Sequence, residues 1–288
     1  MKKLNHFLVI ILLCIAALSY GLCFGFSKNS IFVSAPPEQQ VKLPVIMYHL
    51  VLNDKSRISK FIITPEMFEN DLNYLLENGY TPIDFHELES YVSNGAPLPP
   101  KPVMITFDDG YYNNYKYVYP ILQKNSAKIV LSVIGKQAQK YTEIDDTNPN
   151  YAHCSWNILK EMSDSGLVEV ENHSFDLHTY NASRKGAAKN PGESSESYKK
   201  MLYSDLVNNH KMIESNVGKA PVLFTFPFGN VSKDAHTVVR DIGYKGSLSC
   251  SEGINYISRN PNDLYMLKRY NRSGKLSTEE FFASILND

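Results

Sequence analysis

The chain has 288 residues, enough for one large domain or two small ones. Its 29 lysines and arginines nearly balance its 30 aspartates and glutamates, so the formal charge is −1 and no basic field argues for nucleic acid as a partner. The 19 tyrosines and 14 phenylalanines suit sugar stacking, but ordinary core and surface aromatics explain them equally well.

An uncharged apolar run occupies residues 7–26, directly after a segment that contains Lys2 and Lys3. As a helix it reaches roughly 30 Å, the thickness of the hydrocarbon layer of a membrane. The run is longer than a usual signal-peptide core and its small-x-small exit is poor, which favours an uncleaved anchor over a cleaved signal peptide at 1–26. The lysines predict a cytoplasmic N-terminus. We therefore expect a single-pass membrane protein with an extracellular domain, or a secreted protein if the segment is cleaved.

Residues 27–43 lack an apolar period and contain Pro36-Pro37, so we interpret them as a linker before a single domain at 44–288. In that domain, apolar runs alternate with amphipathic segments. We expect strands at 45–49, 103–107, 128–134, 167–172, 222–226 and 244–249. We expect helices at 65–77, 113–124, 156–164, 195–217, 233–242 and from 278 onward. The alternation predicts a parallel α/β architecture, in which functional residues lie at the carboxyl ends of strands.

Two adjacent carboxylates, Asp108 and Asp109, directly follow the expected strand 103–107. Such neighbours repel each other unless a cation or a proton separates their roles. Gly110 permits a sharp turn that leaves both side chains facing a cleft. Taken alone, a solvated Asp-Asp-Gly turn explains the pattern as well.

Two histidines, His173 and His178, follow the expected strand 167–172. Three ligands of the Asp and His type with one open position form the pattern of a catalytic divalent metal, zinc above all. Cobalt, nickel and iron also suit these ligands. A third segment, 224–230, taken alone is a strand closed by a Pro–Gly turn.

In this order the three segments resemble the polysaccharide deacetylase family (carbohydrate esterase family 4, the NodB homology domain). The family's T-F-D-D-G motif is matched at 106–110, its histidine motif begins at His173, and its P-[YF]-G motif is matched at 227–229. The resemblance extends over about 44–288. It implies a distorted (β/α) barrel of the deacetylase type, here preceded by one N-terminal transmembrane helix.

The resemblance also implies a reaction, the metal-dependent hydrolysis of N-acetyl (or O-acetyl) groups on a cell-envelope or extracellular polysaccharide. Asp109, His173 and His178 would hold the metal, which polarises the carbonyl and acidifies a water. Asp108 would act as general base. The backbone N–H of Phe228 would help to bind the oxyanion.

The histidine spacing departs from the family pattern, because His178 stands at i+5 from His173 instead of i+4. The pair therefore needs a loop or bulge, and Asp176 is the fallback ligand. The arginine that often precedes the third motif is also absent, since Thr225-Phe226 stand there.

The family's late Leu-x-His segment, the source of a general acid, is here Leu267-Lys268-Arg269. His49 is then a candidate proton donor. A catalytically weak or inactive carbohydrate-binding protein on the same fold is the alternative. A serine acyl-enzyme through Ser197-x-x-Lys200 is a weaker one, because no companion motif accompanies it. Whether Cys154 and Cys250 pair stays open.

Overall fold

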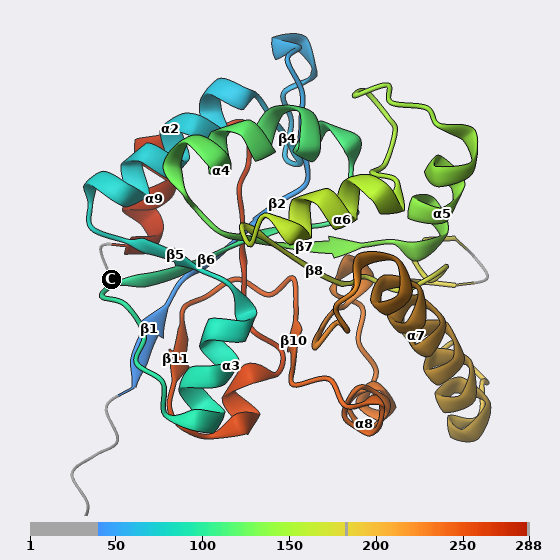
Figure 1. Cartoon of the computed structure of the whole chain (residues 1–288). Coiled ribbons are helices and arrows are strands. Elements are labelled where there is room, and N and C mark those ends of the chain that lie inside the picture. The colour runs from blue at the N-terminus through green and yellow to red at the C-terminus, as the bar shows by residue number, and fades with distance from the viewer. Residues whose placement is uncertain (1–39, 182–183, 287–288) are drawn as a thin grey trace, which may run out of the picture. The chain divides into compact units, whose positions relative to one another are not determined.

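The computed structural model describes residues 40–181 and 184–286 (Figure 1). The predicted membrane segment at 7–26 and most of the predicted linker lie outside the described residues. Within the described ranges, no helix combines the length and the apolar character that a membrane span requires.

A curled parallel sheet of eight strands organises the domain. The strand order is β10-β9-β8-β7-β6-β2-β12, and β5 also pairs with β6. The strands are β2 (Val45–Tyr48), β5 (Thr81–Ile83), β6 (Pro102–Phe107), β7 (Ile129–Val133), β8 (Val168–Asn172), β9 (Leu223–Thr225), β10 (Gly246–Leu248) and β12 (Tyr270–Asn271). The predicted parallel α/β class is confirmed, and the predicted barrel takes the form of a half-barrel.

The two ends of the strand order approach each other through the segment that leads into β12. The Leu267 N–H donates to Ser247 O at 2.8 Å, and the Ser249 N–H donates to Leu267 O at 2.9 Å. Tyr270 and Asn271 then pair in parallel with Ile46 and Met47 of β2. Residues just before β12 are thereby brought to the edge of the sheet where β2 and β6 end.

Helices cover the sheet, with α2, α4 and α6 along one side of β5 to β8 in Figure 1. The helices are α2 (Pro65–Glu77), α3 (Phe85–Asn94), α4 (Tyr119–Asn125), α5 (Gly135–Ile144), α6 (Trp156–Asp164), α7 (Ser195–Val217), α8 (Lys233–Ile242) and α9 (Thr278–Leu286). The shorter turns are η1 (Lys55–Arg57), the π-helical η2 (Asn114–Val118), η3 (Pro227–Gly229) and η4 (Pro261–Leu264). Two small sheets pair β1 (Val41–Leu43) with β11 (Asn255–Ile257) and β3 (Leu50–Val51) with β4 (Ile62–Ile63).

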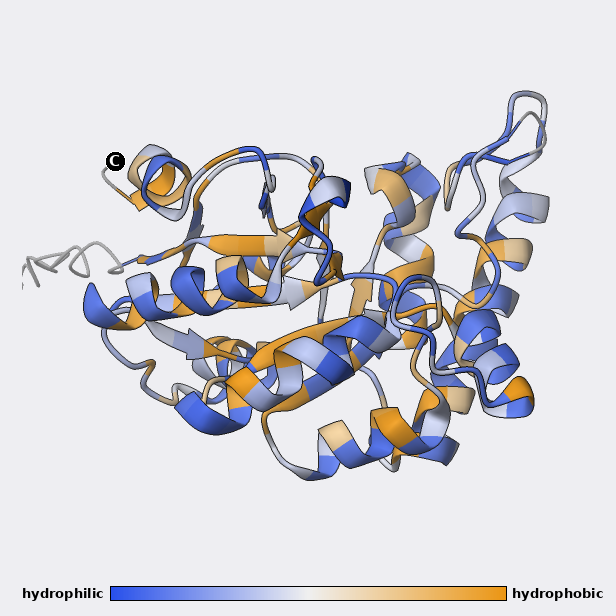
Figure 2. Ribbon diagram, turned by 90° about the horizontal axis from the view of Figure 1, so that it is seen from above, coloured by the Kyte–Doolittle hydropathy of each residue, from blue (hydrophilic) through white to orange (hydrophobic). Residues whose placement is uncertain are grey.

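The core follows the alternation of side chains along the strands. Ile46 and Ile105 belong to the apolar layer shared with α2, α4 and α6. Their neighbours Val45 and Met104 belong to a second layer with α3 and β11. Figure 2 shows the hydrophobic colouring concentrated on the strands and on parts of the helices. Both faces of the sheet are therefore buried, and only the strand ends are available for a site.

Local capping signals explain why several helices match the prediction. The Thr64 hydroxyl accepts from the Met67 N–H, and Pro65 opens α2 as expected. Ser277 and Glu280 form a reciprocal capping box at the start of α9, which accounts for the helix expected from 278 onward. The predicted helices at 65–77, 195–217 and 233–242 are confirmed with the same bounds.

Other elements differ from the prediction. Val41–Leu43, assigned to the linker, form β1, because their partner strand β11 lies far along the sequence and leaves no local signal. The predicted helix at 113–124 begins with the π-helical turn η2. Helix α3 was missed, although Asp84 and Glu87 form a capping box that could have indicated it.

Candidate active site

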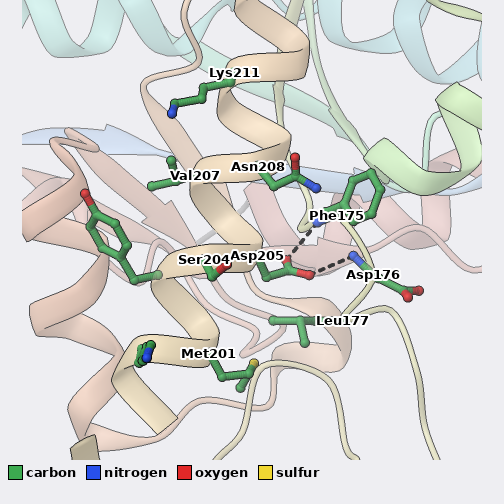
Figure 3. Close-up of a pocket in the computed structure, with 11 residues that line it drawn as sticks. Phe175, Asp176, Leu177, Met201, Ser204, Asp205, Val207, Asn208 and Lys211 are labelled. Carbon is green, nitrogen blue, oxygen red and sulfur yellow. Dashed lines mark hydrogen bonds between the residues drawn. The ribbon is translucent and has the colours of Figure 1, made fainter. Parts of the chain in front are cut away.

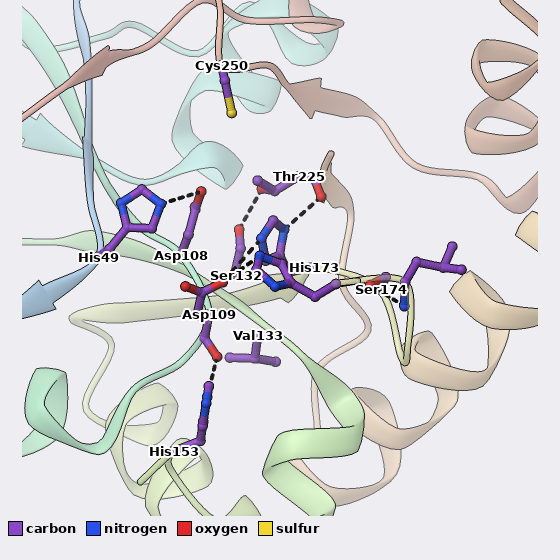
Figure 4. Close-up of polar contacts among 12 residues, drawn as sticks. His49, Asp108, Asp109, Ser132, Val133, His153, His173, Ser174, Thr225 and Cys250 are labelled. Carbon is purple, nitrogen blue, oxygen red and sulfur yellow. Dashed lines mark hydrogen bonds and ion pairs between the residues drawn. The ribbon is translucent and has the colours of Figure 1, made fainter. Parts of the chain in front are cut away.

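The three motifs meet at the carboxyl ends of the parallel strands (Figure 4). Asp108 and Asp109 follow β6, and His173 follows β8. Phe228 lies in η3 after β9, and His49 follows β2. Together with His178 they line one cavity of about 440 Å³.

Asp108 forms a buried ion pair that the sequence did not reveal. Its two carboxylate oxygens accept from the Arg269 guanidinium at 2.7 and 2.9 Å. Arg269 is fully buried and also donates to the Ser249 carbonyl oxygen at 2.8 Å and to the Thr106 hydroxyl at 3.2 Å. This two-pronged contact fixes the orientation of the Asp108 carboxylate.

Asp109, His173 and His178 bring one oxygen and two nitrogens within 4.8 Å of one another. His178 Nε2 lies 3.1 Å and His173 Nε2 lies 3.5 Å from Asp109 Oδ1. The Nδ1 of His173 lies 2.8 Å from the Thr225 carbonyl oxygen. Because a carbonyl oxygen only accepts, Nδ1 carries a proton, and Nε2 is the ring nitrogen that faces Asp109 and His178.

This donor set fits a metal ion. Asp109 Oδ1 is buried and has no hydrogen-bond donor in proper geometry among the described residues. A buried carboxylate oxygen without a partner is costly, and a cation between it and the imidazole lone pairs would satisfy all of them. Bonds of about 2 Å in tetrahedral geometry place ligand atoms about 3.3 Å apart, close to the two separations observed.

Neighbouring charges shift the pKa values of the site in both directions. Burial lowers the pKa of the His173 ring, but the contact with Asp109 outweighs it and the pKa is raised, so a bound metal would have to displace the proton on Nε2. Burial raises the pKa of the Asp108 carboxyl, but the Arg269 charge outweighs it and the pKa is lowered. Burial likewise raises the pKa of Asp109, and the nearby imidazole of His173 reverses the shift. Burial and the charge of His173 lower the pKa of His178 to about 4. At neutral pH both carboxyls are therefore ionised and the His178 ring is neutral.

Left-handed backbone conformations occur in each of the three motifs. Asp109, Ser174 and Phe228 have φ of 72°, 74° and 58°. The strain is held by neighbours, since the His153 ring donates to the Asp109 carbonyl oxygen at 2.9 Å. Strained positions of this kind concentrate at functional sites.

The rim of the cavity is aromatic. Phe61 and Phe228 remain 46% and 41% exposed, and Tyr111 is half-buried beside them. The Phe228 ring lies 4.3 Å from the His178 ring, measured between centroids. These faces are available for stacking on a ligand ring beside Asp109, His173 and His178.

His49 is the remaining histidine of the cavity. Its Nε2 lies 3.9 Å from Asp108 Oδ2, and its Nδ1 is buried without a hydrogen-bond partner among the described residues. Burial lowers the pKa of the His49 ring despite the attraction of Asp108.

The structure thus brings together all five predicted site residues, Asp108, Asp109, His173, His178 and Phe228. The fallback ligand Asp176 lies elsewhere, exposed and paired with Lys136 at 2.7 Å. Cys154 and Cys250 are both free thiols. Ser197 is exposed at the start of α7 and does not line the cavity of the three motifs.

The pairing of Arg269 with Asp108 was not predicted, because the family pattern at Leu267-Lys268-Arg269 calls for a histidine and not for an arginine. The one available signal was that Arg269, a charged residue, lies between the apolar Leu267 and the short strand β12. The contact itself depends on β12 lying beside β2.

Comparisons with known proteins agree with this geometry. A family model described as polysaccharide deacetylase matches residues 95–247, just over half of the chain. The poly-beta-1,6-N-acetyl-D-glucosamine N-deacetylase of Staphylococcus aureus is 25% identical, over 74% of this chain and 69% of that protein. The Escherichia coli K12 protein of the same name is 23% identical, over 96% of this chain but only 44% of that protein.

Solved structures share the fold. A de-N-acetylase from Aggregatibacter actinomycetemcomitans superposes with a TM-score of 0.71 at 25% identity, over 86% of this chain and 99% of that one. A Streptococcus pyogenes deacetylase in complex with acetate has a TM-score of 0.68 at 21% identity, over 85% and 99% of the two chains. Motifs, fold and family model therefore agree that the chain belongs to the polysaccharide deacetylase family and is an enzyme of that class.

Proposed function

We propose that the chain removes N-acetyl (or O-acetyl) groups from a cell-envelope or extracellular polysaccharide in a metal-dependent reaction. The observation that carries this proposal is the pairing of two units in one cavity. An Asp108 carboxylate held ionised by Arg269 lies beside the three-ligand cluster of Asp109, His173 and His178. A carbohydrate-binding protein needs no ionised base at that position, so the alternative reading is disfavoured.

When bound, a divalent metal, zinc first and otherwise cobalt, nickel or iron, would polarise the acetyl carbonyl and lower the pKa of a water. Asp108 would take the proton of that water as general base. The backbone N–H of Phe228 would donate to the oxyanion that develops on the carbonyl oxygen. The left-handed backbone at Phe228 supports this role, because it makes the chain leave the direction of β9 at the residue whose N–H would donate.

His49 would deliver a proton to the departing amine in place of the absent Leu-x-His histidine. Its position 3.9 Å from Asp108 would let the proton removed by the base reach the ring. Because burial lowers the pKa of this ring, its protonated form is a stronger acid than an exposed imidazolium. No histidine on another element is then required.

Poly-β-1,6-N-acetylglucosamine is the first substrate to test, because the Staphylococcus aureus and Escherichia coli relatives carry that substrate in their names. The exposed rings of Phe61 and Phe228 would stack on sugar rings beside the reacting acetamide. A membrane anchor at 7–26 would hold the catalytic domain on the outer surface, near such a polymer.

The test is acetate release from N-acetylglucosamine oligomers by the full-length chain, with added zinc or cobalt and after chelation. We expect metal-dependent release that Asp108→Asn abolishes. Asp176→Asn is the matched control, since it neutralises an exposed aspartate between the two histidines whose side chain pairs with Lys136 outside the cavity, and it should leave release unchanged. Metal binding and sugar retention without acetate would instead favour the carbohydrate-binding alternative.

A further inference from the structure

The histidine loop, defined as residues 173–178, has to solve a geometric problem. In a helix, residues five apart point about 140° away from each other, and in a strand they point to opposite faces. Neither regular structure can direct His173 and His178 to one metal. Yet both Nε2 atoms lie within 3.5 Å of the same oxygen of Asp109. Something outside the loop must determine its shape.

Helix α5 satisfies the carbonyl groups of the loop. The Gly135 N–H donates to Ser174 O and the Lys136 N–H donates to Phe175 O, both at 3.1 Å. These are the first two residues of α5, whose N–H groups have no partner within the helix. One end of α5 therefore holds two successive carbonyls of the histidine loop.

Asp205 of α7 satisfies the N–H groups of the same two peptide units. Its Oδ1 accepts from the Phe175 N–H at 2.8 Å and its Oδ2 accepts from the Asp176 N–H at 2.9 Å (Figure 3). The carboxylate thus bridges two consecutive amides midway between His173 and His178. An ionised acceptor makes such bonds stronger than neutral ones.

Asn209 lies one turn further along α7 and ties the start of the loop to the sheet. Its side-chain amide donates to Ser174 O at 3.0 Å, to Asn172 Oδ1 at 2.8 Å and to Val133 O at 3.1 Å. The side chain is fully buried. A Cβ at Gly135 would lie 2.0 Å from Asn209 Oδ1, so glycine is needed where α5 and α7 meet at the loop.

We infer that Asp205 and Asn209 are positioning residues that set the i, i+5 geometry of His173 and His178, and through it the metal affinity of the site. The inference rests on the proposed metal-dependent function. Both residues reach the loop through its backbone or through Asn172, and neither belongs to the metal cluster. Positioning residues of this kind typically change metal affinity by about 10–100-fold when they are replaced.

The surroundings of Asp205 make it the better residue to replace. Asp205 is half-buried and borders a surface cavity of about 830 Å³ lined by the loop and α7. Water can therefore reach the freed N–H groups in Asp205→Ala, and the domain is expected to fold. Asn209 is enclosed on all sides, so its replacement would confuse loop shape with core stability.

The test measures zinc affinity of the full-length chain by competition with a chromophoric chelator. We expect Asp205→Ala to weaken zinc binding by about 10–100-fold and Asp205→Asn to weaken it less, because one acceptor oxygen remains. Glu214→Gln, which neutralises an exposed carboxylate on the same helix, is the matched control and should stay within twofold of the wild type. Melting temperatures in excess chelator report the stability of the metal-free fold separately.

A lower melting temperature with unchanged zinc affinity in both Asp205 variants would overturn the inference, leaving Asp205 a merely structural residue. If Asp205→Ala fails to fold, the isosteric Asp205→Asn decides by the same criterion. Absence of binding of zinc, cobalt, nickel and iron alike in the wild type would instead refute the proposed function. If the wild type binds zinc and both Asp205 variants bind it with the same affinity, only the positioning role is refuted.

Discussion

Replacing Arg269 by methionine would leave the Asp108 carboxylate buried without its counter-ion. Two unit charges about 4 Å apart attract each other by about 4 kcal/mol at an effective dielectric constant of 20. Both partners are almost fully buried, and breaking such a pair from one side costs about 3–5 kcal/mol. For a domain of this size each kcal/mol lowers the melting temperature by about 2–4 °C, so we expect a loss of roughly 6–20 °C.

The pH dependence of the loss follows from the sign of the pKa shift. In the wild type the pKa of Asp108 is lowered, so its ion pair stabilises the fold above the unfolded pKa of about 3.9 and the contribution fades as the pH falls. In Arg269→Met only the nearby His173 and His49 oppose burial, so we expect the pKa of Asp108 to rise. The variant therefore loses stability as the pH rises. Its melting temperature should lie further below that of the wild type at pH 8 than at pH 5.

Activity supplies a second assay of the same pair. Because the base must be ionised, the acidic limb of kcat/KM for acetate release should move to higher pH in Arg269→Met. Arg269→Lys keeps the charge but loses the two-pronged contact, so it should show a smaller displacement. An unchanged acidic limb in Arg269→Met, with wild-type melting at pH 8, would refute the assignment of Arg269 as the partner of the base.

Three other outcomes can be checked on the same protein. His178→Ala removes a proposed ligand and should weaken zinc binding by more than the roughly 10–100-fold typical of residues that only support a ligand. Asp176→Ala should leave zinc affinity unchanged. Equal losses in the two variants would show that His178 is not a metal ligand. His49→Phe should lower kcat by about 10²–10⁴-fold with unaltered zinc affinity, and full activity would exclude His49 as proton donor. Burial raises the pKa of both Glu169 and Glu171, with a further rise at Glu169 from the charge of Asp84 and at Glu171 from the charge of Glu169, so the pair destabilises the fold as the pH rises above about 4.3. Glu169→Gln should therefore raise the melting temperature at pH 8 but not at pH 4, and a pH-independent effect would contradict this.

The features that the sequence predicted correctly are those with local signals. The apolar run before Asp108 indicated β6, and Thr64-Pro65 indicated the start of α2. Carboxyl ends of parallel strands share one edge of a sheet, so placing Asp109 and His173 after separate strands was enough to bring them together.

The features that were missed depend on contacts between distant segments. The Asp108–Arg269 pair exists because β12 lies beside β2, and no pattern near Arg269 announces that neighbour. The i+5 spacing of His178 looked like a departure from the family motif. We attribute this spacing to Asp205 of α7, whose carboxylate binds the backbone between the two histidines. Sequence periodicity alone would place this aspartate on the surface.

The position of β12 has a consequence for the order in which the site is assembled. During synthesis from the N-terminus, Asp109, His173 and His178 all emerge long before Arg269, which immediately precedes the strand that pairs with β2. Contacts between the first and last parts of a chain form slowly, since the intervening loop must first be closed. A chain that ends before residue 269 would keep Asp109, His173 and His178 and yet lack the guanidinium that pairs with the buried Asp108 carboxylate. The Asp108–Arg269 pair can therefore form only after the C-terminal segment has been made.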